Sequence, residues 1–135
     1  MALQLSVAVR NAMLDAIETT IGTSAVLKIR TGAPPASVAT ADSGTVLATL
    51  TLPSDWMAGA SAGSKAKSGT WEDASADAAG TAAHYRIYAS DGTTAHLQGT
   101  VTATGGGGDL TVDNLVFAAG QSFTITSYSW TAPNA

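Results

Sequence analysis

Two histidines are the first residues in this sequence that could do chemistry, because imidazole nitrogens bind metals and exchange protons near neutral pH. His84 and His96 are the only histidines in the chain. A zinc site would need further ligands, and the predicted pairing of the surrounding strands places Arg86 opposite His96. A guanidinium at that position would repel a cation. The sequence therefore predicts no metal site.

The carboxylates, serines and glycines give no stronger indication of catalysis. Glu72 and Asp73 are adjacent, so on a strand their side chains point to opposite faces and form a poor acid–base pair. Ser61 stands in the sequence G-x-S-x-G (Gly59–Gly63), but the stretch 58–68 predicts a weak edge strand or a loop with no helix after it, so the strand–turn–helix context of a nucleophile turn is missing. The Gly105–Gly108 run lacks the Lys-Ser/Thr pair and the helix that follow a phosphate-binding loop. We expect a protein that is not an enzyme and that uses no cofactor.

The aromatic residues allow another function, a platform for sugar binding. The same residues suit core and interface positions, where a large apolar ring with a hydrogen-bonding tip is common, and we favour that interpretation. The set comprises Trp56, Trp71, Tyr85, Tyr88, Tyr128 and Trp130.

The stretch Thr81–Thr102 is the best-specified element and predicts a β-hairpin, because apolar and polar residues alternate on both arms. A three-residue loop, Ser90–Gly92, places Tyr85 opposite Leu97 and Arg86 opposite His96. One face of the hairpin is then apolar. The other face is polar and aromatic, and it carries His84, Arg86, Tyr88, His96 and Gln98.

The polar face of this hairpin is where we expect function. Arg and Tyr are enriched at the centres of protein interfaces, because they combine apolar area with hydrogen-bonding tips. The alternative is that these residues cover a solvated sheet. Tyr128 and Trp130 join the candidates because they fall out of phase with Phe123 and Ile125 on the last predicted strand, 122–131. Either a bulge shifts that strand, or it shows two aromatics to a partner. The candidate interface residues are His84, Arg86, Tyr88, His96, Tyr128 and Trp130.

Composition limits the class of protein. The 135 residues suit a single domain, and no apolar run approaches the length of a membrane span or the pattern of a signal peptide. A net charge of −4 argues against a nucleic-acid partner. Charged residues make up only 12% of the chain. Because a surface with few charges promotes association, we expect a homo-oligomer that is part of an assembly. Because the chain has no cysteine, disulfides and thiolate sites are excluded.

The pattern of residues 6–20 predicts an amphipathic helix, and this helix makes up most of a separate N-terminal segment, residues 1–22. Ser6 is a suitable N-cap and Gly22 a suitable stop. An apolar stripe at helical spacing comprises Val9, Ala12, Met13, Ala16 and Ile17. The favoured interpretation is a helix that covers one end of a β core. The other is an arm that packs on a neighbouring subunit.

Residues 23–135 predict a β domain. Stretches 25–31 and 45–52 alternate cleanly, Pro34, Pro35 and Pro53 end them, and 58–68 predicts a weak edge strand or a loop. About eight short strands separated by turns indicate a mainly β fold, a jelly-roll-like antiparallel β-sandwich with the helix at its N-terminus.

Four stretches resemble a family of small structural proteins of tailed bacteriophages. They are LTLPSDW (Leu50–Trp56), SGTWED (Ser68–Asp73), HYRIY (His84–Tyr88) and GTVTATGGGGDLTVDN (Gly99–Asn114). The resemblance implies a capsid decoration, or cement, protein that binds the major capsid protein and itself on the outer surface of the virion, after synthesis in the cytoplasm of the host bacterium. It carries over no catalytic residue. The alternative is a binding module of a phage tail or baseplate, with carbohydrate as a possible ligand.

Overall fold

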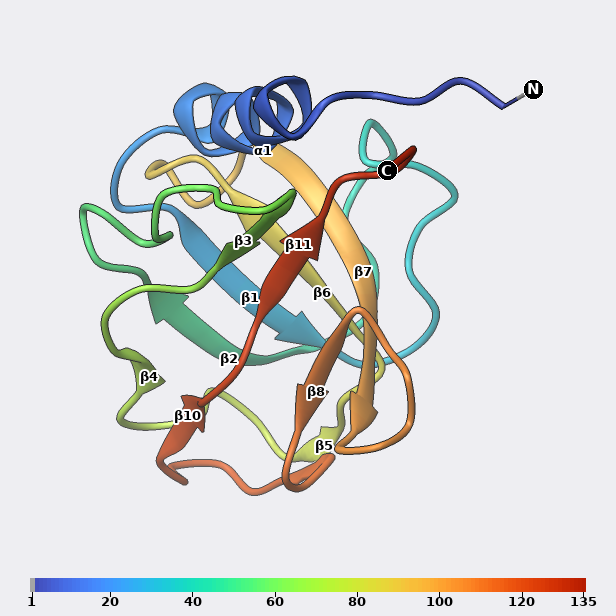
Figure 1. Cartoon of the computed structure of the whole chain (residues 1–135). Coiled ribbons are helices and arrows are strands. Elements are labelled where there is room, and N and C mark those ends of the chain that lie inside the picture. Colours follow the sequence, from blue (N-terminus) through green and yellow to red (C-terminus); the bar gives the residue numbers. More distant parts are fainter. Residues whose placement is uncertain (1) are drawn as a thin grey trace.

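The computed structural model describes residues 2–135, and the chain is mainly β, as predicted (Figure 1). The elements are α1 (Val7–Ile21), β1 (Val26–Arg30), β2 (Val46–Thr51), β3 (Ser64–Ala66), β4 (Trp71–Asp73), β5 (Gly80–Thr81), β6 (His84–Tyr88), β7 (Ala95–Ala103), β8 (Leu110–Val112), β9 (Val116–Phe117), β10 (Phe123–Ile125) and β11 (Ser129–Thr131).

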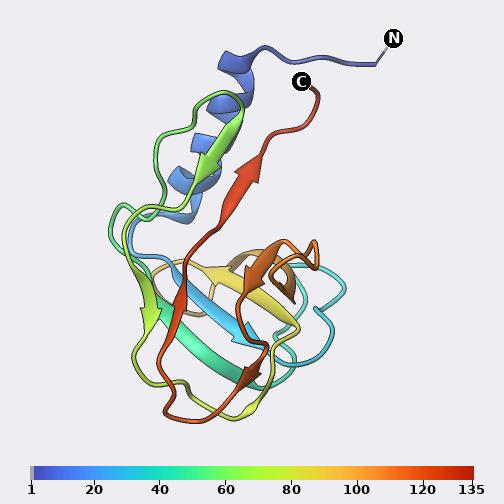
Figure 2. The same ribbon diagram turned by 60° about the horizontal axis from the view of Figure 1, so that its bottom comes forward.

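A curled sheet of five strands forms the centre of the fold, in the order β2-β1-β6-β7-β8 (Figure 2). Its strands are antiparallel except for β8, which runs parallel to β7. Leu27, Ile29 and Ile87 fill the apolar side of the sheet and are fully buried. All five residues of β6 are buried, so this strand is covered on both of its faces.

Three pairs of short strands complete the fold: β4 with β10, β3 with β11, and β5 with β9. The strand predicted over residues 122–131 is interrupted between β10 and β11. This interruption changes the phase, so that Ile125 and Tyr128 are both buried. β10 pairs near the five-stranded sheet and β11 pairs beside the helix, so the C-terminal segment connects the two regions (Figure 2).

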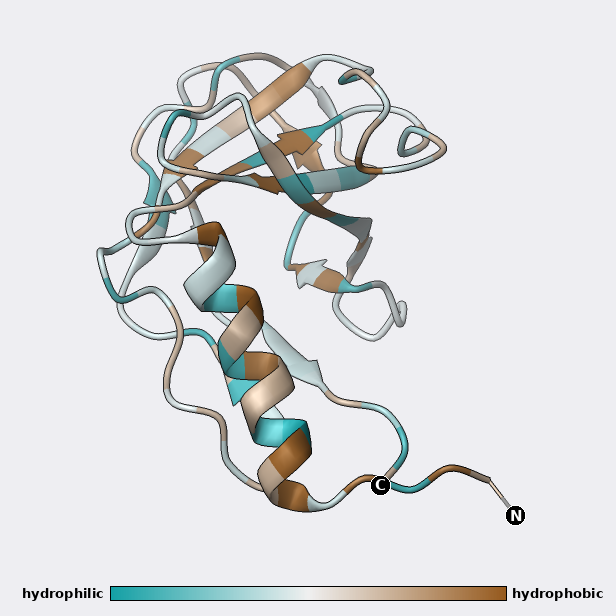
Figure 3. Cartoon of the chain, turned by 90° about the horizontal axis from the view of Figure 1, so that it is seen from above, coloured by the Kyte–Doolittle hydropathy of each residue, from teal (hydrophilic) through white to brown (hydrophobic). Residues whose placement is uncertain are grey.

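Helix α1 has the predicted caps, Ser6 and Gly22, and each of its bounds lies one residue after the predicted one. The Ser6 hydroxyl accepts a hydrogen bond from the Val9 backbone N–H, and the Gly22 N–H donates to the Glu18 carbonyl. The helix extends away from the sheet, with its C-terminal end nearest to it (Figure 3). In the described residues 2–135, it is neither long nor apolar enough to cross a membrane.

The helix packs on the domain through the face opposite to the expected one. Its buried residues are Arg10, Leu14 and Ile21, whereas Val9, Met13 and Ile17 of the predicted apolar stripe are exposed. The expectation that this stripe covers the β core is therefore wrong. The cause is a set of polar partners on the loop 58–68 and at the C-terminus.

Polar contacts hold this inverted helix. The Arg10 guanidinium donates to the Ala132 carbonyl at 2.9 and 3.2 Å, and the Asn11 side-chain oxygen accepts from the Gly63 N–H at 2.8 Å. Gly63 has a positive φ of 75°, a conformation that favours glycine, and a Cβ at this position would also push the Arg10 guanidinium from its place. The polar side of α1 is thus the docking side.

The hairpin of β6 and β7 is present, with a register that differs from the predicted one by two residues. Arg86 pairs with Gln98, and the pairing of Tyr88 with Ala95 leaves His96 as an extra residue in β7. The loop is longer than predicted because the Asp91 carboxylate accepts hydrogen bonds from the Thr93 and Thr94 backbone and closes a wider turn. A shift of two residues preserves the faces of a strand, so the predicted polar and apolar sets still hold, except for His96, which the bulge removes from the ladder.

Candidate functional site

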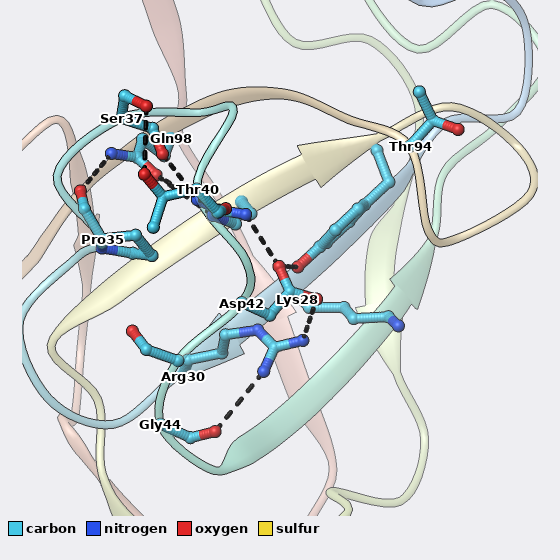
Figure 4. A network of polar contacts seen from close by, with 12 residues as sticks. Lys28, Arg30, Pro35, Ser37, Thr40, Asp42, Gly44, Thr94 and Gln98 are labelled. Carbon is cyan, nitrogen blue, oxygen red and sulfur yellow. Dashed lines mark hydrogen bonds and ion pairs between the residues drawn. The ribbon is translucent and has the colours of Figure 1, made fainter.

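The polar face of the hairpin is buried, so the prediction that it forms an interface is wrong for three of its residues. His84, Arg86 and Tyr88 are at most 1% exposed. The loop 32–44 lies over them and supplies their partners (Figure 4). His96 alone is exposed, because it occupies the bulge at the start of β7.

Arg86 is the centre of this buried polar cluster. Its guanidinium donates to the Ser37 and Thr40 carbonyls at 3.0 and 2.9 Å, and to the Gln98 side-chain oxygen at 2.8 and 3.1 Å. It also forms an ion pair with Asp42 at 2.8 Å. The Gln98 amide in turn donates to the Pro35 carbonyl. The planar guanidinium therefore connects the loop 32–44 to the sheet in several directions at once.

Asp42 connects the same loop to three strand residues. One carboxylate oxygen accepts from Arg86 and from the Tyr88 hydroxyl, each at 2.8 Å, and the other pairs with Arg30 at 2.9 Å. Burial alone would raise the pKa of Asp42. The hydrogen bond from Tyr88 and the charges of Arg30 and Arg86 outweigh it and lower the pKa below the ordinary 3.8. The cluster thus has a structural role, which is to clamp the loop onto the sheet.

The depressed pKa of Asp42 predicts acid sensitivity. A carboxyl whose pKa is lower in the folded state adds stability above its unfolded pKa, near 3.9, and this stability is lost as the pH falls through the folded value. We expect the melting temperature of the protein to fall below about pH 4, and to fall less steeply for Asp42→Asn, which starts from a lower value at pH 7. Thermal unfolding followed from pH 7 to pH 2 tests this.

Asp91→Asn is the control for the acid experiment, because Asp91 also has a lowered pKa but belongs to the hairpin turn and makes no contact with the loop 32–44. Protection of the loop 32–44 from hydrogen exchange should fall with pH in the Asp91→Asn variant as in the wild type. Equal pH slopes for the wild type and Asp42→Asn would contradict the role assigned to Asp42.

The two histidines do not come together. His84 donates from Nδ1 to the Gly32 carbonyl at 2.7 Å, because a carbonyl can only accept, and its Nε2 is buried without a protein partner. Within residues 2–135 no group of three or more His, Asp or Glu side chains is placed to hold a metal ion.

Tyr128 belongs to the core and was wrongly predicted at an interface. Its hydroxyl lies 2.7 Å from the Tyr85 hydroxyl and accepts from the Trp130 indole N–H at 2.8 Å. Burial raises the pKa of Tyr128 to about 12. Its ring packs against those of Trp71, Tyr85 and Trp130. Trp130 is half-buried.

A polar groove of about 320 Å³ lies beside this aromatic cluster. The three groups Tyr85, Tyr128 and Trp130 have three donor hydrogens, but the two contacts among them use only two. One tyrosine hydroxyl proton is therefore left without an acceptor among these contacts. The residues that line the groove include Tyr85, Asp109, Tyr128, Ser129, Trp130 and Thr131.

The most unusual surface is the side of α1 that faces away from the domain, which we call the outer helix face and define as Val9, Ala12, Met13, Ala16 and Ile17. All five residues are exposed, and Met13 at its centre is 41% exposed. The charged side chains of α1 instead engage the domain: Arg10 contacts the C-terminal segment, and Asp15 and Glu18 contact Lys65. Spacing in the sequence identifies this stripe correctly but does not say which way it points.

Comparisons of the chain with protein-family models, with curated proteins and with solved structures found no match. The proposed function therefore rests on the sequence and the structure of the chain itself.

Proposed function

We propose that this chain is a non-enzymatic structural protein of a bacteriophage virion, of the capsid-decoration type, which binds the outer surface of the capsid and reinforces the shell. The resemblance of four stretches between Leu50 and Asn114 to small phage structural proteins supports the phage setting. We also propose a jelly-roll-like sandwich as the architecture. The contact of β4 with β2 supports it, since the short pair β4–β10 is a separate small sheet that lies next to the five-stranded sheet.

The outer helix face is the observation that carries this proposal. A free soluble domain rarely exposes a contiguous row of aliphatic side chains, and such a row marks a surface that a partner covers. The charges that would keep the helix soluble are engaged on its inner side instead. His84 and the Arg86 cluster, where reactive groups could lie, hold the loop 32–44 on the sheet. An exposed apolar face of this kind is typical of a protein whose surface is covered by a partner in an assembly.

Repetition explains how weak contacts could reinforce a shell. Each copy would contribute a modest contact, but copies joined to each other and to the capsid act together, and the effective concentration of each contact rises. The low proportion of charged residues, 12%, also suits close packing of many copies without mutual repulsion.

Shells of the encoding phage, emptied of DNA and stripped of this chain, provide the test. We expect the purified chain to sediment with these shells, to appear at symmetry-related positions on their outer surface in electron cryomicroscopy, and to raise the temperature at which they rupture. Bare shells are the control. A wild-type chain that leaves the shell surface bare would contradict the proposal.

The polar groove favours a second candidate function, a carbohydrate-binding module of a tail or baseplate. It combines the half-buried Trp130 ring with the Asp109 carboxylate and the one tyrosine hydroxyl proton that is not used within the cluster, which together match the apolar faces and hydroxyl groups of a sugar ring. A glycan array would show specific binding that Trp130→Ala and Asp109→Asn both abolish. Binding of this kind without any attachment to shells would favour the module over the decoration protein.

A further inference from the structure

The outer helix face has a different shape at its two ends. At the N-terminal end Val9 is 46% exposed, and Leu3, in the segment before the helix, is 71% exposed. At the C-terminal end the surface is hollow, with a volume of about 300 Å³. The hollow is lined by Met13, Ala16, Ile17, Thr20, Ile21 and His96. One end therefore carries protruding aliphatic groups and the other a mainly apolar recess.

We propose that the outer helix face binds the same face of a second copy of this chain, with the two helices antiparallel about a two-fold axis near Met13. The inference rests on the proposed function, since it names the partner of the surface on which that function was argued. In a two-fold contact the same surface of both copies meets, so each copy must contribute both the protruding groups and the recess that receives them. The antiparallel arrangement places the protruding end of each helix over the recess of the other.

The charges of α1 also favour a copy of the same chain as the partner. Arg10, Asp15 and Glu18 are engaged with Ala132 and Lys65 of their own domain, so the outer face presents no charged side chain of the helix to a partner. A face of this kind selects an equally uncharged apolar surface. The outer helix face itself has this chemistry, and Ala12 and Ala16 beside the larger residues allow two helices to approach closely.

The orientation follows from the position of the sheet. The helix meets the sheet at its C-terminal end and extends away from it, and its N-terminal end lies beside the C-terminus of the chain (Figure 3). In an antiparallel pair the two sheets lie at opposite ends and do not compete for space. A parallel pair would bring the two sheets and both His96 side chains to the same end, and it would leave each recess opposite the other recess.

The size of the face predicts a weak dimer. A helix of 15 residues is about 22 Å long, and a contact one helix wide over that length lies at the small end of protein interfaces. We expect a dissociation constant on the order of 10⁻⁵ M for the free chain. Such a contact would be mostly dissociated in dilute solution and populated at the local concentration of an assembly.

Sedimentation equilibrium of the full chain, from about 1 μM to about 1 mM, measures this association around the expected constant. Met13→Glu places two carboxylates together at the two-fold axis, and we expect it to weaken the dimer by about 100-fold or more. Val116→Glu is the matched control, because Val116 is 61% exposed on β9, away from the helix, and adds the same charge. Thermal unfolding of each variant verifies that it folds.

Disulfide trapping tests the orientation, because the chain has no cysteine of its own. Met13→Cys should form a disulfide-linked dimer. Val9→Cys alone should not, since two copies of residue 9 would lie about 12 Å apart along an antiparallel pair. A mixture of Val9→Cys and Ile17→Cys chains should link to each other. A Val9→Cys homodimer that forms as readily as the Met13→Cys dimer would overturn the antiparallel arrangement.

The remaining outcomes separate this inference from the proposed function. A chain that is monomeric at about 1 mM, or whose association Val116→Glu weakens as much as Met13→Glu, overturns the inference. If that monomer binds shells and Met13→Glu abolishes the binding, the capsid covers the outer helix face and the proposed function stands. A chain that dimerises as described but leaves shells bare confirms the inference and removes the proposed function.

Discussion

Replacing Arg86 with alanine is expected to destabilise the protein by about 3–5 kcal/mol, the usual cost of removing one partner from a buried ion pair. The change leaves the Ser37 and Thr40 carbonyls and the Gln98 side chain without their donor, and it opens a cavity between the loop 32–44 and the sheet. For a domain of this size the melting temperature should fall by roughly 10–20 °C. Urea unfolding and calorimetry measure both quantities.

Two further variants identify the cause of this loss. Arg86→Lys keeps the charge but not the fork of donors, so it should recover only part of the stability. His96→Ala changes an exposed residue of the same hairpin without side-chain partners and should shift the free energy of unfolding by less than about 0.5 kcal/mol. If Arg86→Ala proved as stable as the wild type, the cluster under the loop 32–44 would not be the clamp described above.

The sequence predicted the elements more accurately than their surroundings. The helix, the mainly β character and the faces of the hairpin follow from periodicity, which depends on residues near one another in the chain. The register could not be fixed in this way, because a shift of two residues leaves the same side chains on the same faces. The Asp91 carboxylate, which closes a wider turn than the one assumed, decides the register.

The burial of the polar hairpin face could not be predicted from the spacing of residues along the hairpin. His84, Arg86 and Tyr88 have the spacing of a solvated or interface surface, and the loop that covers them consists largely of small residues with no regular pattern. Its contribution is mainly backbone carbonyls, which every residue has, together with Asp42. The sequence around Asp42 gives no sign that this carboxylate contacts two arginines and a tyrosine of distant strands.

The helix shows the same limit at larger scale. Amphipathicity identifies two faces, and burying the apolar one is the default because the hydrophobic effect favours it. Here Lys65 in β3 supplies a buried cation that draws the acidic side of the helix inward. Lys65 lies in the stretch 58–68, for which the sequence predicts a weak edge strand or a loop, but it is only 2% exposed. The outcome depends on a contact between residues 50 positions apart.

Removal of the Lys65 charge is therefore expected to release the helix. Lys65 forms ion pairs with Asp15 at 2.7 Å and Glu18 at 2.8 Å. Burial alone would lower the pKa of Lys65, but its hydrogen bonds to the two carboxylates outweigh it and raise the pKa. Lys65→Met keeps most of the apolar stem and leaves two acidic side chains facing the domain without a cation, and should cost about 2 kcal/mol.

The location of this loss distinguishes it from general destabilisation. Hydrogen exchange should show that amides of α1 lose protection in Lys65→Met while those of β1 and β6 keep it, because the five-stranded sheet makes its own hydrogen bonds. Lys67→Met is the matched control, since Lys67 lies two residues further on, donates to the Gly69 carbonyl and touches neither carboxylate. Uniform loss of protection over helix and sheet, or equal effects of the two lysine variants, would show that Lys65 does not set the orientation of α1.

Released helices would also lose the fixed outer helix face, so Lys65→Met should weaken self-association although residue 65 lies on the opposite side of the helix.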